Sequence, residues 1–365
     1  MNKKKDGEFR SKVYEMRPEY ADYESEKKFE AIRSIIISRL LEHPNACCSY
    51  SGGSDSDILL HLIETCREQA NLPPVKYFFF ETGIEMEATR RHVKEMSIKY
   101  GVEIETIRPK KNIVIATREY GVPFMSKIVS AAMNSIQKKN VPLSIRKEYD
   151  SAEDKHAIRA ELKRRYPNAE QAINFICCCN SNGDPRPDIQ LVVDSSAFLY
   201  DFLCEFPPDF EISAKCCDYC KKAPAHEVQK DYEMIITGER RDEGGMRSVP
   251  KKGEENATMC FSKMGEDQFR LKPLFYVSNK DKEWYKITNG IKYSDAYEVY
   301  GLTRTGCCGC SISSKAVSDL EKIGEYEPNL KKAAYSVFGK SYEYRRKYNE
   351  YKKKRREELK DVGKK

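Results

Sequence analysis

The fold is decided by one stretch of the chain, ACCSYSGGSDSDILLHL at residues 46–62. Its first five residues form an apolar run typical of a short buried strand, and residues 57–69 have the apolar spacing of a helix. Ser51-Gly52-Gly53-Ser54-Asp55-Ser56 connects the two. Glycine lets the backbone approach a phosphate closely, and a helix N-terminus adds N–H groups that favour an anion. We therefore expect a phosphate site, in which Ser51 and Ser56 donate hydrogen bonds and Asp55 holds Mg²⁺; the alternative is an ordinary glycine-rich turn.

The sequence on either side continues the alternation of strand and helix. Strands are predicted at 75–80, 102–107 and 233–237, and helices at 27–41 and 85–100. This order is typical of an α/β fold with a doubly wound, mainly parallel sheet. Further helices are predicted within 108–139, near 152–165, at 281–288 and at 294–300; a strand is predicted at 189–193, and residues 239–268 are expected to be rich in loops.

Three regions follow from this pattern. We expect an N-terminal helical extension at 1–45, a nucleotide-binding domain at 46–320 with an insertion at 140–215, and a basic helical C-terminal extension at 321–365.

The charge of the chain is concentrated at its end. The 365 residues carry a net charge of +7, and residues 340–365, with 12 basic and 5 acidic side chains, account for all of it. Such a segment is typical of a solvated helix, and the alternative is a surface that attracts nucleic acid. No apolar run approaches the ~20 residues of a membrane helix. The charged first residues lack the apolar core of a signal peptide, so we expect a cytoplasmic protein without a membrane partner.

The fourteen cysteines are clustered, and a cytoplasmic location would keep them reduced. Cys216-Cys217 lies about 90 residues before Cys307-x-x-Cys310, and four such thiolates favour a [4Fe–4S] cluster or tetrahedral Zn²⁺. Adjacent cysteines can reach one metal centre only from a helix or a tight turn. Cys217-x-x-Cys220 is half of an alternative zinc site. The remaining clusters, Cys47-Cys48 and Cys177-Cys178-Cys179, are expected to be structural, as are the five histidines.

Three arginines follow the strand predicted at 233–237, namely Arg240, Arg241 and Arg247. Ligands of doubly wound sheets bind beyond the carboxyl ends of the strands. A guanidinium group there suits a sulfate or a second phosphate, and the alternative is a solvated charged loop.

Taken in order along the chain, these motifs resemble the PP-loop ATP-pyrophosphatase superfamily and, within it, the phosphoadenosine phosphosulfate (PAPS) reductase family. Residues 51–56 resemble the PP-loop, and Glu81-Thr82-Gly83 resembles the segment after the family's second strand, where Asp is usual instead of Glu. Later segments, Gly238 to Arg247 and Arg304 to Cys307, match in the same order, so the likeness spans roughly residues 46–312.

The resemblance implies an adenine nucleotide alpha hydrolase-like fold. It also implies a set of nucleotide contacts, which are Ser51, Gly52, Gly53, Ser54, Asp55, Ser56, Glu81, Thr82, Gly83 and Arg240. The cysteine pattern is similar to the cluster site of adenylyl-sulfate reductases, which implies a [4Fe–4S] cluster on Cys216, Cys217, Cys307 and Cys310, with Lys221 and Lys222 nearby.

One feature of the reductases is missing. They attack the sulfate sulfur with a cysteine near the C-terminus, and here no cysteine follows Cys310. The complete Ser-Gly-Gly-x-Asp-Ser loop also resembles the ATP-cleaving branch of the superfamily. We therefore expect an ATP pyrophosphatase that activates a substrate for sulfur transfer, with Asp55, Arg240 and Arg247 as catalytic residues.

This prediction implies ATP with Mg²⁺ and a sulfur donor such as a cysteine desulfurase. Proteins that thiolate DNA or tRNA use the same general scheme, in which a substrate is activated with ATP before sulfur is transferred. One alternative is a sulfonucleotide reductase with Cys220, Cys308 or one of Cys177–Cys179 as its nucleophile. Another is a non-enzymatic component of a larger complex that binds a nucleotide and a cluster.

Overall fold

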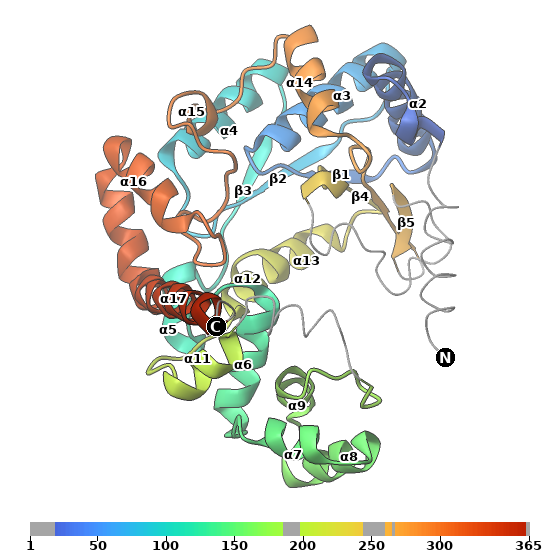
Figure 1. Ribbon diagram of the computed structural model, residues 1–365. Coiled ribbons are helices and arrows are strands. Elements are labelled where there is room, and N and C mark those ends of the chain that lie inside the picture. Colours follow the sequence, from blue (N-terminus) through green and yellow to red (C-terminus); the bar gives the residue numbers. More distant parts are fainter. Residues whose placement is uncertain (1–18, 185–197, 244–259, 265–266, 363–365) are drawn as a thin grey trace. The chain divides into compact units, whose positions relative to one another are not determined.

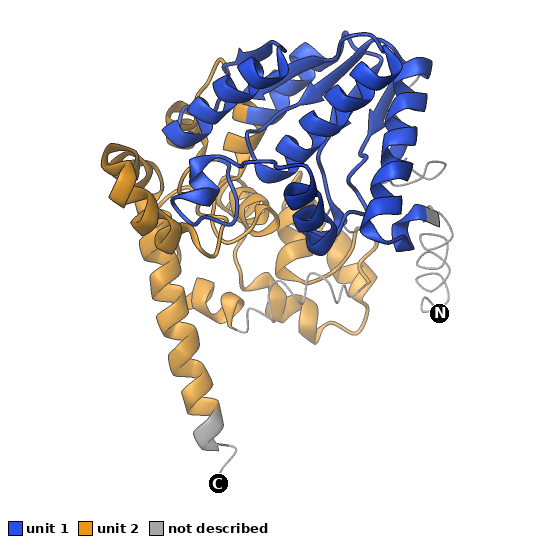
Figure 2. Ribbon diagram, turned by 90° about the horizontal axis from the view of Figure 1, so that it is seen from above, with its two compact units in different colours: residues 1–109, 221–306 blue, residues 110–220, 307–365 orange. Residues whose placement is uncertain are grey.

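The computed structural model describes residues 19–184, 198–243, 260–264 and 267–362. Contacts divide the chain into two compact units, each built from two segments of the sequence. Unit 1 comprises residues 1–109 and 221–306, and unit 2 comprises residues 110–220 and 307–365 (Figure 2). The strand predicted at 189–193 lies outside the described residues.

Unit 1 contains a six-stranded sheet in the order β3-β2-β1-β4-β6-β5. All neighbouring strands are parallel except the antiparallel pair β5–β6. The prediction of an α/β fold with a mainly parallel sheet is confirmed, as are the strands expected near 46–50, 75–80, 102–107 and 233–237. The strands are β1 (Ala46–Ser49), β2 (Lys76–Phe80), β3 (Ile104–Ile107), β4 (Met234–Thr237), β5 (Phe261–Met264) and β6 (Gln268–Leu271).

Successive side chains of each strand point to opposite faces of the sheet, and both sets are apolar. Both faces are therefore covered by helices. Cys48 and Met234 belong to the larger core, which includes side chains of α2, α3, α4 and α14. Cys47 and Ile235 point to the opposite face, where Val228 of α13 packs. Figure 1 shows the ribbon of α13 on the other side of the strands from α2 and α3. These helices are α2 (Ser25–Glu42), α3 (Ser54–Ala70), α4 (Glu87–Tyr100), α13 (Ala223–Gln229) and α14 (Asn279–Thr288); α15 (Asp295–Glu298) is shorter.

Strand β5 lies within residues 239–268, the region expected to be rich in loops, of which residues 244–259 and 265–266 are outside the described residues, and β6 follows directly. Gln268-Phe269-Arg270-Leu271 alternates polar and apolar residues, but at four residues each the two segments give only a weak local signal. Both nevertheless join the sheet, since β6 pairs with β4 and β5 pairs with β6. Long-range pairing therefore overrides a weak local signal.

Unit 2 is helical, and its core is formed by a separate set of buried side chains. The helical C-terminal extension is confirmed, and Tyr344 and Tyr348 of α17 belong to that core. No helix in the described stretches is long and apolar enough to cross a membrane. The helices are α5 (Ile113–Tyr120), α6 (Lys127–Lys139), α7 (Ile145–Ser151), α8 (Lys155–Arg165), α9 (Glu170–Ile176), α11 (Leu199–Glu205), α12 (Lys215–Cys217), α16 (Ala316–Tyr326) and α17 (Pro328–Val362).

Candidate functional site

The glycine-rich loop leaves β1 at the centre of the sheet and enters α3. Gly52 has a φ of +65°, and a Cβ there would lie 2.9 Å from Cγ2 of Thr89, so both conformation and space require glycine. Gly53 caps the helix, and its N–H donates to Oγ of Ser56 at 2.9 Å. Ser51 Oγ also donates to Ser56 Oγ, at 3.2 Å. These bonds hold the loop in shape at a helix N-terminus, where the backbone favours an anion.

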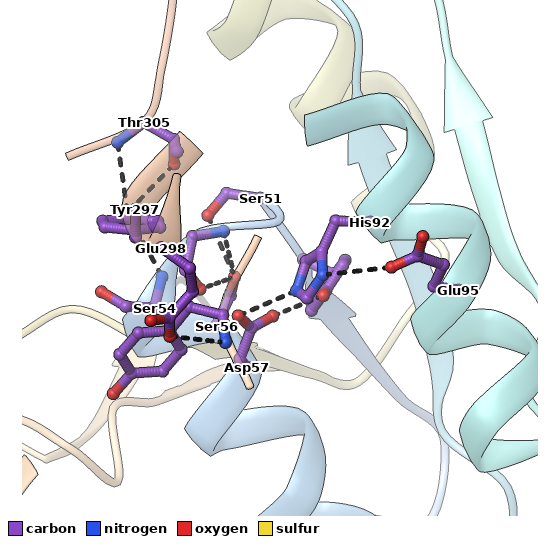
Figure 3. Close-up of polar contacts among 12 residues, drawn as sticks. Ser51, Ser54, Ser56, Asp57, His92, Glu95, Tyr297, Glu298 and Thr305 are labelled. Atoms are coloured by element: carbon purple, nitrogen blue, oxygen red, sulfur yellow. Dashed lines mark hydrogen bonds and ion pairs between the residues drawn. The ribbon is translucent and has the colours of Figure 1, made fainter. Parts of the chain in front are cut away.

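The hydroxyl of Tyr297 lies over this N-terminus (Figure 3). The backbone N–H of Ser54 donates to Tyr297 Oη at 3.3 Å, and the backbone N–H of Thr305 donates to the same oxygen at 3.2 Å. Thr305 Oγ1 lies 3.3 Å from it. A neutral phenolic oxygen thus accepts two N–H groups that an anionic oxygen would accept more strongly.

Asp55 is held by two cations. Its Oδ1 atom lies 2.9 Å from Arg240 Nε and 2.8 Å from Lys282 Nζ, as ion pairs without hydrogen-bond alignment. Arg240 also donates to the carbonyl of Val277 and to Asn279 Oδ1, each at 3.0 Å. Because these bonds fix a guanidinium that is almost fully buried, the position of the Asp55 carboxylate is fixed as well.

A network of buried hydrogen bonds stabilises the two ends of the loop. Tyr50 donates to Asp57 Oδ1 at 2.5 Å, and His92 Nε2 lies 3.0 Å from Asp57 Oδ2 (Figure 3). Burial and the Asp57 carboxylate raise the pKa of Tyr50 well above its ordinary value, so the hydroxyl remains a donor. Tyr50 precedes the loop and Asp57 follows it, so their bond joins the two ends of residues 51–56.

The polar groups of the segment Glu81-Thr82-Gly83 are bonded to side chains close to it in the fold. Glu85 accepts from the backbone N–H of Thr82 at 2.8 Å and from that of Gly83 at 2.9 Å. Glu81 is paired with Arg90 at 2.6 Å and Arg108 at 2.8 Å. Burial acts to raise the pKa of Glu81, but the hydrogen bonds from both arginines outweigh it and hold the pKa below its ordinary value. The carboxylate is therefore ionised and committed to these two cations.

A cavity of about 810 Å³ adjoins the loop within unit 1, a volume typical of a small-molecule site. It extends from the carboxyl ends of β1, β2 and β4 along the face of the sheet that α13 covers. Its polar lining includes Ser51, Glu85, Lys221, Lys222, Lys230, Glu239, Asp267 and Arg270.

The four cysteines predicted as metal ligands all belong to unit 2. Cys216 and Cys217 lie in the short helix α12, a conformation from which adjacent thiols can reach one centre. A hydrogen bond with Cys217, burial, and the thiols of Cys310 and Cys307 together raise the pKa of Cys216, which shows that the four are neighbours. In the described part of the chain, however, no group of three or more cysteine, histidine or acidic residues converges tightly enough to form a metal site.

The other cysteines are in different surroundings. Cys220 is buried and donates to the carbonyl of Lys111 at 3.4 Å. Cys177, Cys178 and Cys179 belong to the core of unit 2, and Arg146 approaches Cys178 Sγ at 3.5 Å. All fourteen cysteines are present as thiols.

The sequence alone did not identify Lys282, Tyr297, His92 or Asp57 as parts of the site. Nothing local distinguishes them, since Lys282 is 228 residues from Ser54, to which its Nζ donates at 2.6 Å. Arg247, predicted to be catalytic, lies outside the described residues.

Comparison with known proteins gives one family and several distant structures. The family model for the phosphoadenosine phosphosulfate reductase domain matches residues 45–152 and 199–313. Comparison with curated proteins returns no match. A PAPS reductase from Candida auris in complex with phosphate is 13% identical, with 76% of this chain and 87% of that chain covered and a TM-score of 0.37. The FMN adenylyltransferase of Candida glabrata in complex with ATP is 12% identical, with 82% and 70% covered and a TM-score of 0.38. Both scores are too low to bear on function.

Proposed function

Because the chain belongs to the phosphoadenosine phosphosulfate reductase domain family, we propose that it binds an adenine nucleotide at residues 51–56 and cleaves ATP to AMP and pyrophosphate, activating an acceptor for sulfur transfer. The observation that supports nucleotide binding most directly is the Ser54 N–H, which is directed at Tyr297 Oη. A phosphate oxygen would accept this N–H more strongly than the phenol does, and the released Tyr297 hydroxyl would donate a hydrogen bond to the phosphate. Cleavage of ATP is favoured over sulfonucleotide reduction because the complete Ser-Gly-Gly-x-Asp-Ser loop at residues 51–56 resembles the ATP-cleaving branch of the superfamily.

With free sulfide as the sulfur donor, the reaction balances without an oxidant or a reductant. An oxygen of the acceptor attacks the α-phosphorus of ATP, the bond to the β-phosphate oxygen breaks, and pyrophosphate leaves. Sulfide then attacks the activated carbon of the acceptor, and AMP leaves with the acceptor's oxygen. A donor that carries persulfide sulfur, such as a cysteine desulfurase, needs in addition a thiol reductant, which supplies two electrons and becomes a disulfide. The protein contributes positioning and compensation of charge, which dominate catalysis of phosphoryl and nucleotidyl transfer.

Asp55 is the residue that would hold Mg²⁺. Arg240 and Lys282 both contact Oδ1, so within the described contacts Oδ2 is directed to neither cation. A carboxylate oxygen is a ligand that Mg²⁺ prefers. The metal would supply neutralisation of charge on the phosphates, and Arg240 and Lys282 would add two positive charges beside the same groups.

We also propose that Cys216, Cys217, Cys307 and Cys310 hold a [4Fe–4S] cluster. Cysteine thiolates are the usual ligands of such a cluster, and Cys217, Cys307 and Cys310 lie near enough to Cys216 to raise the pKa of its thiol. The four thiols would have to draw closer together to bind it, because they do not converge on one centre in the described structure. The spacing of a Cys-Cys pair and a Cys-x-x-Cys pair supports a cluster over Zn²⁺. Iron and zinc contents of anaerobically purified protein would distinguish the two.

The exposed charges of α17 favour a small acceptor over nucleic acid. Lys340, Lys347 and Lys354 are exposed, and so are Glu343 and Glu350 between them. Acids at this spacing weaken the field that a polyanion would meet, because each lies one helical turn from a lysine. The pattern is that of a solvated helix.

The experiment that tests the proposal compares nucleotides on anaerobic protein. Binding of Mg-ATP, adenylyl sulfate and its 3′-phosphorylated form would be measured by competition, together with release of pyrophosphate. We expect ATP to bind most tightly and pyrophosphate to form once the acceptor is added. Tighter binding of a sulfonucleotide, with release of sulfite, would instead establish the reductase, whose nucleophile would be sought by replacing Cys220 and Cys308 with serine. Binding without either product would favour a non-catalytic component.

A further inference from the structure

Arg270 occupies an unusual position in the sheet. It lies in β6, between β4 and β5, and pairs with Ile235. Its neighbours Phe269 and Leu271 pack on the core with α2 and α3. Since side chains alternate along a strand, Arg270 projects from the opposite face, and it lines the 810 Å³ cavity there.

No hydrogen bond or ion pair engages the guanidinium of Arg270 among the residues that the structure describes. Glu239 and Asp267 line the same cavity, but neither carboxylate is within ion-pair distance of it. Arg270 is partly buried, and a cation removed from water is costly unless an opposite charge accompanies it. Lys230 in the wall formed by residues 221–230 adds positive charge to the same cavity. The arrangement suits an anionic guest.

This anion is separate from the phosphates expected at the loop. The carboxyl end of β4 is Thr237, which pairs with Ser49 just before the loop. Ile235, and therefore the backbone of Arg270, lies two residues earlier, about 7 Å deeper at roughly 3.3 Å per residue. A nucleotide with its phosphates at the N-terminus of α3 leaves this end of the cavity to a second group.

We propose that the end of the cavity at Arg270 binds the oxyanion, a carboxylate or a phosphate, of a small acceptor that occupies unit 1 together with the nucleotide. The planar guanidinium fork matches both oxyanions with two hydrogen bonds. This inference rests on the proposed function, because it names the acceptor class of the same site. It assigns to Arg270 the selection of acceptors that carry a negative charge.

The test uses Arg270→Gln, with Lys263→Gln as the matched control. Lys263 is an exposed cation on the adjacent strand, opposite Phe269, and does not line the cavity. Malonate and inorganic phosphate would be titrated by calorimetry into the whole protein saturated with the magnesium complex of a non-hydrolysable ATP analogue. We expect each variant to bind the nucleotide as the parent does. Arg270→Gln should bind one or both oxyanions about tenfold more weakly or worse, whereas Lys263→Gln should not change.

Several outcomes separate the alternatives. Equal oxyanion binding by Arg270→Gln and the parent would overturn the proposal. So would a loss confined to 3′-phosphorylated adenylyl sulfate, because Arg270 would then contact the nucleotide's own phosphate. Arg270→Lys keeps the charge but not the planar guanidinium fork, so it should retain part of the affinity. Partial binding by this variant would show that the loss in Arg270→Gln does not come from a folding defect. The titrations are repeated without nucleotide, so that failure of the analogue to bind would count against the proposed function alone.

Discussion

Replacing Asp55 with asparagine tests the most specific claim about the loop. The substitution keeps the size of the side chain and removes the negative charge that lies 2.9 Å from Arg240 and 2.8 Å from Lys282. If Asp55 holds Mg²⁺, the effect on ATP binding should change sign with the metal. Metal-free ATP should bind more tightly, because a repelling carboxylate is gone, and Mg-ATP should bind more weakly, because a ligand is gone.

The magnitude follows from Coulomb's law for a phosphate charge near the Asp55 carboxylate. Two unit charges about 6 Å apart interact by roughly 3 kcal/mol at an effective dielectric constant of about 20. Partial exposure and salt reduce this to about 1 kcal/mol, or about a fivefold gain in affinity for metal-free ATP. Loss of a metal contact should weaken Mg-ATP by about tenfold or more. The ratio of the two dissociation constants should therefore change by about 50-fold.

The assay is competition binding of ATP with excess Mg²⁺ and with a chelator, at matched ionic strength. The control is Asp295→Asn, since Asp295 is also an ion-paired aspartate of unit 1, 2.7 Å from Arg91, but has no contact with the loop in the described structure. Arg240 keeps its bonds to Val277 and Asn279, so the variant should fold. A loss of affinity that is equal with and without Mg²⁺ would refute the metal role of Asp55.

Three further predictions follow. Tyr297→Phe removes the hydroxyl over the loop and should weaken nucleotide binding by about three- to tenfold, because a hydrogen bond to phosphate is lost. Tyr293→Phe is the control, since the Tyr293 hydroxyl has no hydrogen-bond partner in the described structure. Equal effects of the two substitutions would argue against a phosphate contact of Tyr297. Cys307→Ser should lower the iron content of anaerobically purified protein, whereas replacement of the exposed Cys204 should not; iron retained in full by the first variant would remove Cys307 from the ligand set. Burial acts to raise the pKa of Asp281, but hydrogen bonds from Lys28 and Ser278 lower it to about 2, below the 3.8 of an ordinary aspartate. The buried pair with Lys28 should therefore contribute about 2 kcal/mol of stability above about pH 4 that is lost as the pH falls towards 2; urea unfolding of Asp281→Asn across this range checks it, and a difference that persists at pH 2 would contradict the assignment.

The parts of the site that the sequence reveals are those built from neighbouring residues. The strand, the loop at 51–56 and helix α3 follow one another within one short stretch, so apolar spacing and glycine placement were enough to locate them. The Cys-Cys and Cys-x-x-Cys pairs are visible for the same reason. That these four thiols are neighbours became evident only when α12 and the turn before α16 were placed in one unit.

The partners of the loop were decided by tertiary structure. Tyr297 is 243 residues from Ser54, and Lys282 is 228 residues from it, so no periodicity relates them. Arg270 is the clearest case, because only the pairing of β6 with β4 places its charge at the cavity. The sequence pattern of a segment indicates its backbone geometry and which of its side chains are buried. Which strand pairs with which, and which charge meets which, depends on contacts between distant segments, and only the folded chain determines them.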